Sequence, residues 1–249
     1  MDGQTEALVS DEQTEALLRI GQDISAVLAD AKISIEYVKY FEAHAAREAE
    51  ATPSKLPHWP EPVSRVFQGL QALNIHARAR IYHVASTYYS WPLYERALCM
   101  AAPSPAHLCK LVVLENKRWR ASTTNTPAQH ANARHYAVLV QYVQTVSTSA
   151  LTDFVRSLDG GSVARKHFNF RLASADVSWE LTGYGKNGVS PIAMARDVPV
   201  VMSAAITRLQ PPVFWLGAGH VDFKLALPVQ AFVDATQCMV AEVSEPVIS

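Results

Sequence analysis

Hydrophobic side chains recur at alternating three- and four-residue steps between residues 17 and 41, which is the spacing of one face of a helix. Ser10 followed by Gln13 fits a capping box, so the helix is expected to begin there. Ser34 is the one polar break in a narrow seam of the kind found in coiled coils. The seam could pack on the rest of the chain, pair with a second copy, or dock another protein. Its members are Leu17, Ile20, Ile24, Val27, Ala31, Val38 and Phe41.

Four prolines, at positions 53, 57, 60 and 62, follow this arm. Proline removes a backbone donor and fixes φ, so a helix cannot continue through such a segment, which is expected to form a stiff linker. The chain therefore divides into a helical arm with its linker at residues 1–62 and a second unit at residues 63–249.

From residue 63 the apolar pattern alternates between the helical and the extended period. Helices are predicted at residues 63–73, 92–101 and 149–158, from Ser174 towards residue 181, and from Pro228 onward. Strands are predicted at residues 79–83, 110–114, 135–143, 168–172, 198–202, 213–216, 221–225 and 239–243. Only some of these strands are separated by helices long enough for parallel crossovers. The expected fold is mixed α/β, with a mixed sheet that curls towards a barrel and has flanking helices.

Composition narrows the class of protein. With 49% hydrophobic and 18% charged residues among 249, the chain can bury a sizeable core. Its three cysteines form no CxxC pair and its nine histidines show no HExxH spacing, so no metal site and no cofactor is predicted. The longest apolar stretches are too short to span a bilayer and the N-terminus lacks a signal-peptide pattern. A cytoplasmic protein without a membrane partner is expected.

Charge is distributed unevenly. Of 22 basic and 23 acidic side chains, residues 1–60 hold 5 and 11, which leaves 17 and 12 for the rest. A phosphate-rich partner would therefore be attracted to the body and repelled by the arm.

The most distinctive stretch is LTGYGKNGVSPI at residues 181–192, where three glycines and a proline lie between a predicted helix and a strand. Such a loop can turn several backbone N–H groups towards one point, which suits binding an ester carbonyl or stabilising an oxyanion. On composition alone, an ordinary tight connection is the favoured interpretation.

This loop resembles the hallmark loop of the YbaK/ProX family of aminoacyl-tRNA editing domains. The resemblance extends to VPVV at residues 198–201 and to FWLGAGHVDFKL at residues 214–225, and upstream to Lys110 and Tyr82. It spans about three quarters of the chain. It implies the family's fold and hydrolysis, in trans, of the ester that joins a wrong amino acid to tRNA, most typically cysteine or alanine on the tRNA for proline. The implied partner is tRNA and not DNA.

The resemblance also implies residue roles. The implied catalytic residues are the lysine and the loop that would hold the ester carbonyl: Lys110, Asn187, Gly188, Val189, Ser190 and Pro191. The implied substrate-binding residues are Tyr82, Leu216, Gly217, Gly219 and Asp222. Attack could come from water, from the substrate's own thiol or with help from the ribose hydroxyl. Ser190 lacks the elbow motif of a covalent nucleophile.

Two positions depart from the family pattern. Asn187 stands where the G-x-x-x-P loop has its first glycine, and Leu216 replaces a small polar residue. Asparagine tolerates the left-handed backbone region better than most residues, so the loop can keep its shape. Leucine would make one pocket wall more apolar, and both changes bear on which amino acid is accepted.

A basic cluster with one aromatic residue is the candidate tRNA contact, because phosphate charge beside a stacking ring suits an RNA end. A solvated hairpin tip is the alternative. The cluster is Lys117, Arg118, Trp119 and Arg120. The competing function is a catalytically silent tRNA-binding or scaffold subunit of an aminoacyl-tRNA synthetase assembly, which would use the N-terminal helix to dock the synthetase or another protein.

Overall fold

The computed structural model describes Lys39, Glu42 and residues 59–120 and 132–247. The predicted capping box, the coiled-coil seam, most of the linker and the loop at 121–131 lie outside the described residues. Glu42 is helical, and its carboxylate accepts hydrogen bonds from Arg78 at 2.5 and 2.7 Å. Within the described part of the chain, no helix combines the length and the apolarity required to cross a bilayer.

The larger sheet is mixed and has five strands in the order β5-β2-β3-β6-β9. Their bounds are β2 (Cys109–Asn116), β3 (His135–Gln141), β5 (Phe170–Leu172), β6 (Val200–Ser203) and β9 (Met239–Ala241). β2 runs antiparallel to both β3 and β5, whereas β3, β6 and β9 are parallel. The parallel pairs are joined by connections that contain helices, as crossovers require.

A smaller antiparallel sheet has the order β1-β8-β7, with β1 (Arg80–His83), β7 (Val213–Gly217) and β8 (Phe223–Pro228). A two-stranded ladder pairs β4 (Gln144–Val146) with β10 (Ser244–Pro246), neither of which the sequence pattern predicts. Leu108, just before β2, makes an isolated parallel bridge with Trp215 of β7. The predicted mixed α/β fold with flanking helices is confirmed, and the sheets meet at β2 and β7 without closing into a barrel.

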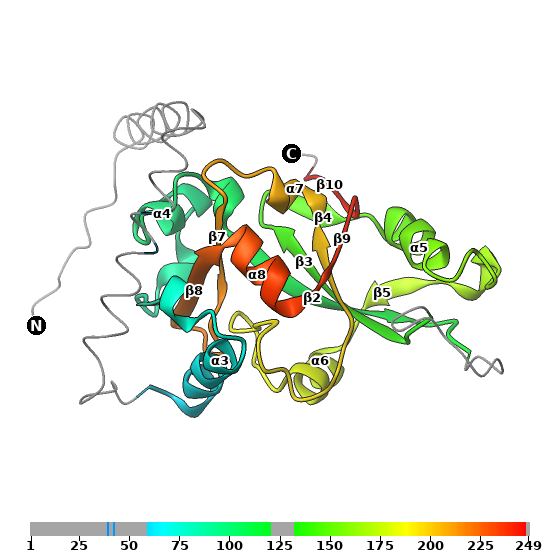
Figure 1. Ribbon diagram of the computed structural model, residues 1–249, viewed down its shortest axis with the longest axis horizontal. Coiled ribbons are helices and arrows are strands. Elements are labelled where there is room, and N and C mark those ends of the chain that lie inside the picture. Colours follow the sequence, from blue (N-terminus) through cyan, green and yellow to red (C-terminus); the bar gives the residue numbers. More distant parts are fainter. Residues whose placement is uncertain (1–38, 40–41, 43–58, 121–131, 248–249) are drawn as a thin grey trace, which may run out of the picture.

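Six α-helices accompany the sheets within the described residues. They are α3 (Glu61–Ala72), α4 (Leu93–Leu98), α5 (Thr148–Ser157), α6 (Ala175–Thr182), α7 (Ala204–Thr207) and α8 (Val229–Thr236). Short 3-10 turns lie at His76–Arg78, Tyr88–Ser90, Pro105–His107 and Arg165–His167. α4 is shorter than predicted, and the chain beyond it turns at Ala101, whose φ is +52°. Figure 1 shows α3 and α4 beside the smaller sheet at one end, α5 at the other, and α8 between them.

The core follows from the alternation of side chains along β3, which is buried on both faces. Leu139 packs in one cluster with residues of α8 and of the smaller sheet. Val138 and Val140 pack in another cluster, with Leu151 and Val155 of α5. Apolar residues at consecutive positions of β3 therefore serve two cores, which fixes the larger sheet relative to the helices that cover it.

Candidate functional site

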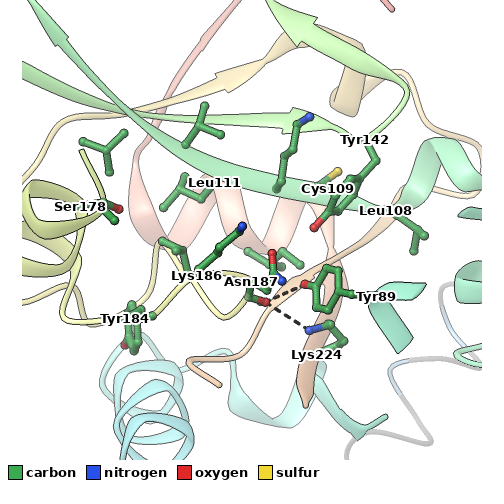
Figure 2. Close-up of a pocket in the computed structure, with 18 of the residues that line it drawn as sticks. Tyr89, Leu108, Cys109, Leu111, Tyr142, Ser178, Tyr184, Lys186, Asn187 and Lys224 are labelled. Carbon is green, nitrogen blue, oxygen red and sulfur yellow. Dashed lines mark hydrogen bonds between the residues drawn. The ribbon is translucent and has the colours of Figure 1, made fainter. Parts of the chain in front are cut away.

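A pocket of about 700 Å³ opens between β2, the end of β7, α6 and the loop that follows α6. Figure 2 shows the side chains that surround it. One wall is residues 109–113 of β2, and the facing wall carries residues 184–187 and 189 of the loop. The pocket therefore lies where the strand predicted to carry Lys110 meets the glycine-containing loop.

Lys110 is half-buried on the pocket wall, where β2 pairs its backbone with Val140 of β3. Its Nζ lies 5.4 Å from the centre of the Tyr142 ring. Burial lowers the pKa of Lys110, and no carboxylate of the described residues pairs with it. A cation that is partly desolvated and not neutralised by a carboxylate is suited to stabilise negative charge on a ligand.

The loop is anchored at both ends. α6 begins at Ser174, whose side chain accepts the N–H of Val177, and ends at Gly183, which has φ +70°. Arg65 of α3 donates to the Gly183 carbonyl at 2.6 Å. The Tyr184 hydroxyl donates to the carbonyl of Ile192 at 2.7 Å, which closes residues 184–192 into one compact segment.

The turn itself is set by Asn187, which adopts φ +68°, as asparagine tolerates. The Gly188 N–H donates to the Gly185 carbonyl at 3.0 Å and is therefore engaged within the turn. In the described structure, the N–H groups of Val189 and Ser190 donate to no other group of the chain. Val189 also lines the pocket, so its unengaged amide is a candidate donor to a ligand.

Glycines let the loop approach the β7–β8 turn closely. A Cβ on Gly217 would lie 2.5 Å from the Val189 carbonyl oxygen, and one on Gly188 would lie 2.8 Å from the backbone of His220. The Gly219 N–H donates to the Gly188 carbonyl at 2.8 Å. The two segments thus pack backbone against backbone, which any side chain at these positions would prevent.

The structure brings five of the predicted site residues into the pocket wall: Lys110, Asn187, Val189, Leu216 and Gly217. Six others do not line it: Tyr82, Gly188, Ser190, Pro191, Gly219 and Asp222. Among the latter, Ser190 is fully buried and its Oγ accepts the N–H of Ile192, as a structural serine would. Tyr82 packs against a hydrophobic cluster that includes the pocket residues Tyr88 and Trp215, and the Asp222 carbonyl accepts the N–H of Val84.

The predicted tRNA-binding cluster follows the other end of β2. Lys117 is seven residues beyond Lys110, or roughly 23 Å along an extended strand. Its ammonium pairs with Glu115 at 2.5 Å, and Arg134 pairs with the same carboxylate at 2.8 Å. These two partners are the main cause of the lowered pKa of Glu115.

The other members of this cluster are exposed. Arg118 donates to the Lys166 carbonyl at 3.2 Å. Trp119 is 37% exposed and donates its Nε1–H to Asn132 at 2.7 Å. Exposed Arg120 completes the cluster, which therefore presents cations and a partly exposed ring outside the pocket.

The sequence pattern did not single out several pocket residues: Tyr88, Tyr89, Tyr142, Trp179, Lys186 and Lys224. Lys186 projects into the pocket in Figure 2. Lys224 is only 3% exposed, and burial lowers its pKa to about 8. The available signal was the charged residue inside the otherwise apolar strand FKLAL. A lone lysine at a buried strand position needs partners, which makes it a marker of polar surroundings.

No protein-family model and no curated protein sequence matches the chain. Solved structures do match. One, of a protein proposed to be a trans-editing enzyme for prolyl-tRNA synthetase, has a TM-score of 0.57 at 16% identity, covering 75% of this chain and 99% of that one. A computationally designed epitope scaffold matches with TM-score 0.57 at 13% identity, covering 76% and 100%. A protein described only as hypothetical matches with TM-score 0.54 at 21% identity, covering 73% and 99%. These similarities establish a shared fold.

Proposed function

We propose that this protein hydrolyses, in trans, the ester bond of misacylated aminoacyl-tRNA, of the type in which cysteine or alanine is attached to the tRNA for proline. The observation that carries the proposal is the convergence of Lys110 and Val189 on one pocket. Lys110 supplies a cation and Val189 a backbone amide without an internal acceptor, and both residues line that pocket. The fold shared with a protein proposed to be a trans-editing enzyme supports the assignment.

The reaction needs little beyond these groups. As a nucleophile adds to the ester carbonyl, negative charge develops on its oxygen, and positioned donors lower the barrier by stabilising that charge. In the proposed site the Val189 amide and the Lys110 ammonium supply this stabilisation. The nucleophile is water, the substrate's own thiol or a ribose-assisted water. The burial of Ser190 argues against a covalent serine intermediate.

The proposed tRNA contact is the exposed cluster from Lys117 to Arg120. It begins roughly 23 Å along β2 from Lys110. A single-stranded 3′ end that enters the pocket would leave the remainder of the tRNA outside, where exposed arginines can reach phosphates and Trp119 can stack on a base. Salt-dependent binding is therefore expected.

The test is deacylation of a panel of charged tRNAs by the purified full-length protein. The panel contains cysteinyl-, alanyl- and prolyl-tRNA for proline, and alanyl-tRNA for alanine as the correctly matched control. We expect hydrolysis of at least one mischarged tRNA. Lys110→Ala should lower its rate about 100-fold, the size of effect seen when one oxyanion donor is removed. Lys166→Ala is the matched control, because Lys166 is exposed and outside the pocket.

The same experiment also tests a second function. Asn187 stands where the family pattern has its first glycine, so the site could bind a charged tRNA end without hydrolysing it, as in a silent subunit of a synthetase assembly docked through the N-terminal helix. A wild-type protein that binds tRNA but hydrolyses no member of the panel would favour this second function. Full activity of Lys110→Ala would remove Lys110 from the mechanism.

A further inference from the structure

Lys224 is a buried lysine on the pocket wall for which the proposed chemistry has no use. It lies on β8, paired with Gly217 of β7 on one side and with Tyr82 of β1 on the other. Burying an ammonium group is costly unless polar groups replace its hydration. The polar groups that replace the water around the ammonium therefore show which segments of the chain Lys224 connects.

Carbonyl oxygens and aromatic faces surround the ammonium. Its Nζ lies 2.7 Å from the Val221 carbonyl oxygen, 3.3 Å from that of Asn187 and 3.4 Å from that of Phe223. The ring centres of Tyr89 and Tyr88 lie 4.7 and 5.1 Å away. Among the described residues, no carboxylate forms an ion pair with Lys224, although Asp222 is close enough to favour its charged form.

One of these contacts crosses to the pocket loop. The Asn187 carbonyl accepts both the Lys224 ammonium and, at 2.7 Å, the Tyr89 hydroxyl (Figure 2). Lys224 also donates to Val221, in the β7–β8 turn against which the loop packs. The lysine thus bridges the two backbone segments whose close approach Gly217 permits.

Fixing this carbonyl has a consequence for the next amides of the chain. Peptide groups are planar, so a held C=O fixes the whole Asn187–Gly188 unit. Gly188 precedes Val189, and glycine restrains rotation poorly by itself. The next peptide unit, which carries the Val189 N–H, is held separately by its Gly188 carbonyl, which accepts the Gly219 N–H at 2.8 Å. The contacts at the Asn187 carbonyl therefore fix the unit that leads into Val189.

We propose that Lys224 is a positioning residue that, together with Tyr89, holds the Asn187 carbonyl and so keeps the pocket loop at Asn187 and Gly188 in place against the β7–β8 turn. Its role in rate rests on the proposed deacylase function, whereas its role in ordering the loop does not. Lys224 contacts the loop and not the ester, so its loss should affect turnover more than substrate binding.

The experiment compares wild type, Lys224→Met and Tyr89→Phe by hydrogen–deuterium exchange of full-length protein and by steady-state deacylation. Lys224→Met keeps the length of the side chain and removes the donors, and Tyr89→Phe removes only one hydroxyl. We expect exchange in residues 186–190 to rise about tenfold in Lys224→Met, the factor expected for losing a charged hydrogen bond. A smaller increase of about threefold is expected for Tyr89→Phe, a neutral bond. Exchange in β3 should be unchanged, and kcat should fall about tenfold with KM within about twofold of wild type.

Unchanged exchange of residues 186–190 in both variants would overturn the proposal, as would an unchanged kcat in an active enzyme. If Lys224→Met also accelerates exchange in β3, the variant has unfolded globally and Tyr89→Phe decides the question. If wild type hydrolyses no tRNA, the deacylase proposal fails on its own and the exchange data still test whether Lys224 orders the loop. Tyr94→Phe, which removes a hydroxyl outside the pocket, is the control for losing a tyrosine hydroxyl.

Discussion

The buried charge of Lys224 should be visible as a dependence of stability on pH. The perturbation is Lys224→Met, which removes the titrating group and keeps most of the side-chain volume. The pKa of Lys224 is lowered from 10.5 to about 8 in the folded protein: burial is the main cause, Asp222 and Cys99 oppose it, and Arg96 adds to it. The facing tyrosines, Tyr88 and Tyr89, have raised pKa values because they are buried, so they stay neutral in the pH range that matters.

The sign follows from which state binds more protons. Between pH 8 and 10.5 the lysine is protonated in the unfolded chain and neutral in the folded one, so the free energy of unfolding rises with pH. Each tenfold change in the protonation equilibrium corresponds to about 1.4 kcal/mol. A pKa of about 8 in place of 10.5 therefore contributes on the order of 3 kcal/mol. This stabilisation is fully present above pH 10.5, is lost as the pH falls to 8, and is absent below that.

The assay is urea denaturation followed by tryptophan fluorescence, in reducing buffer, at half-unit steps from pH 7 to 10.5. Other groups titrate in this range, but they are common to both proteins, so the quantity to compare is the difference between wild type and Lys224→Met. That difference should move in favour of wild type by on the order of 3 kcal/mol across the window. Lys166→Met, at an exposed position, controls for the loss of a surface lysine.

Parallel curves for wild type and Lys224→Met would refute the reasoning. They would mean that the folded protein solvates the ammonium as well as water does, so that Lys224 carries no ionisation cost. A difference that moves in the opposite direction would mean that the charged form is favoured by folding.

Two further predictions concern the backbone of the loop. Gly217→Ala places a Cβ 2.5 Å from the Val189 carbonyl oxygen, a backbone atom that cannot move aside cheaply, so we expect a loss of about 1 to 3 kcal/mol in urea denaturation and reduced deacylation. Equal stability would show that the loop tolerates displacement from β7. Asn187→Gly keeps φ +68° accessible and restores the G-x-x-x-P pattern, so we expect stability within about 1 kcal/mol of wild type and deacylation at least as fast. A slower variant would assign the Asn187 side chain a direct part in binding, measured as a raised KM.

Local sequence patterns predicted an element well where a long apolar run is buried or where a capping residue marks the helix end. The apolar run at 135–143 became β3, which ends at Gln141, and Ser174 caps α6 as its residue type favours. The short ladder of β4 and β10 was missed because its strands have three residues each and gain their stability from pairing across the chain.

Some features of the candidate site could be predicted from local sequence, and others depend on residues that are distant in sequence. The glycine pattern at 181–192 identified the loop, because positive φ and close backbone approach limit which residues can stand there. Tyr89 could not be found by pattern, since it meets Asn187 across 98 positions of sequence. The role of Tyr82 in substrate binding stays a prediction: it does not line the pocket, and the register of β1 on β8 places it opposite Lys224, beside a hydrophobic cluster that includes the pocket residues Tyr88 and Trp215.

The sequence by itself determined where the longer helices and strands form and which segment could supply unengaged amides, because periodicity, capping and glycine geometry act over a few residues. Only the tertiary structure decided that Lys110 and Val189 share a pocket, that the Gly188 amide is engaged within its own turn, and that Lys224 is buried against the Asn187 carbonyl. Those outcomes depend on how two sheets pack at β2 and β7. Such packing is a sum of many contacts between distant positions, and no local pattern records it.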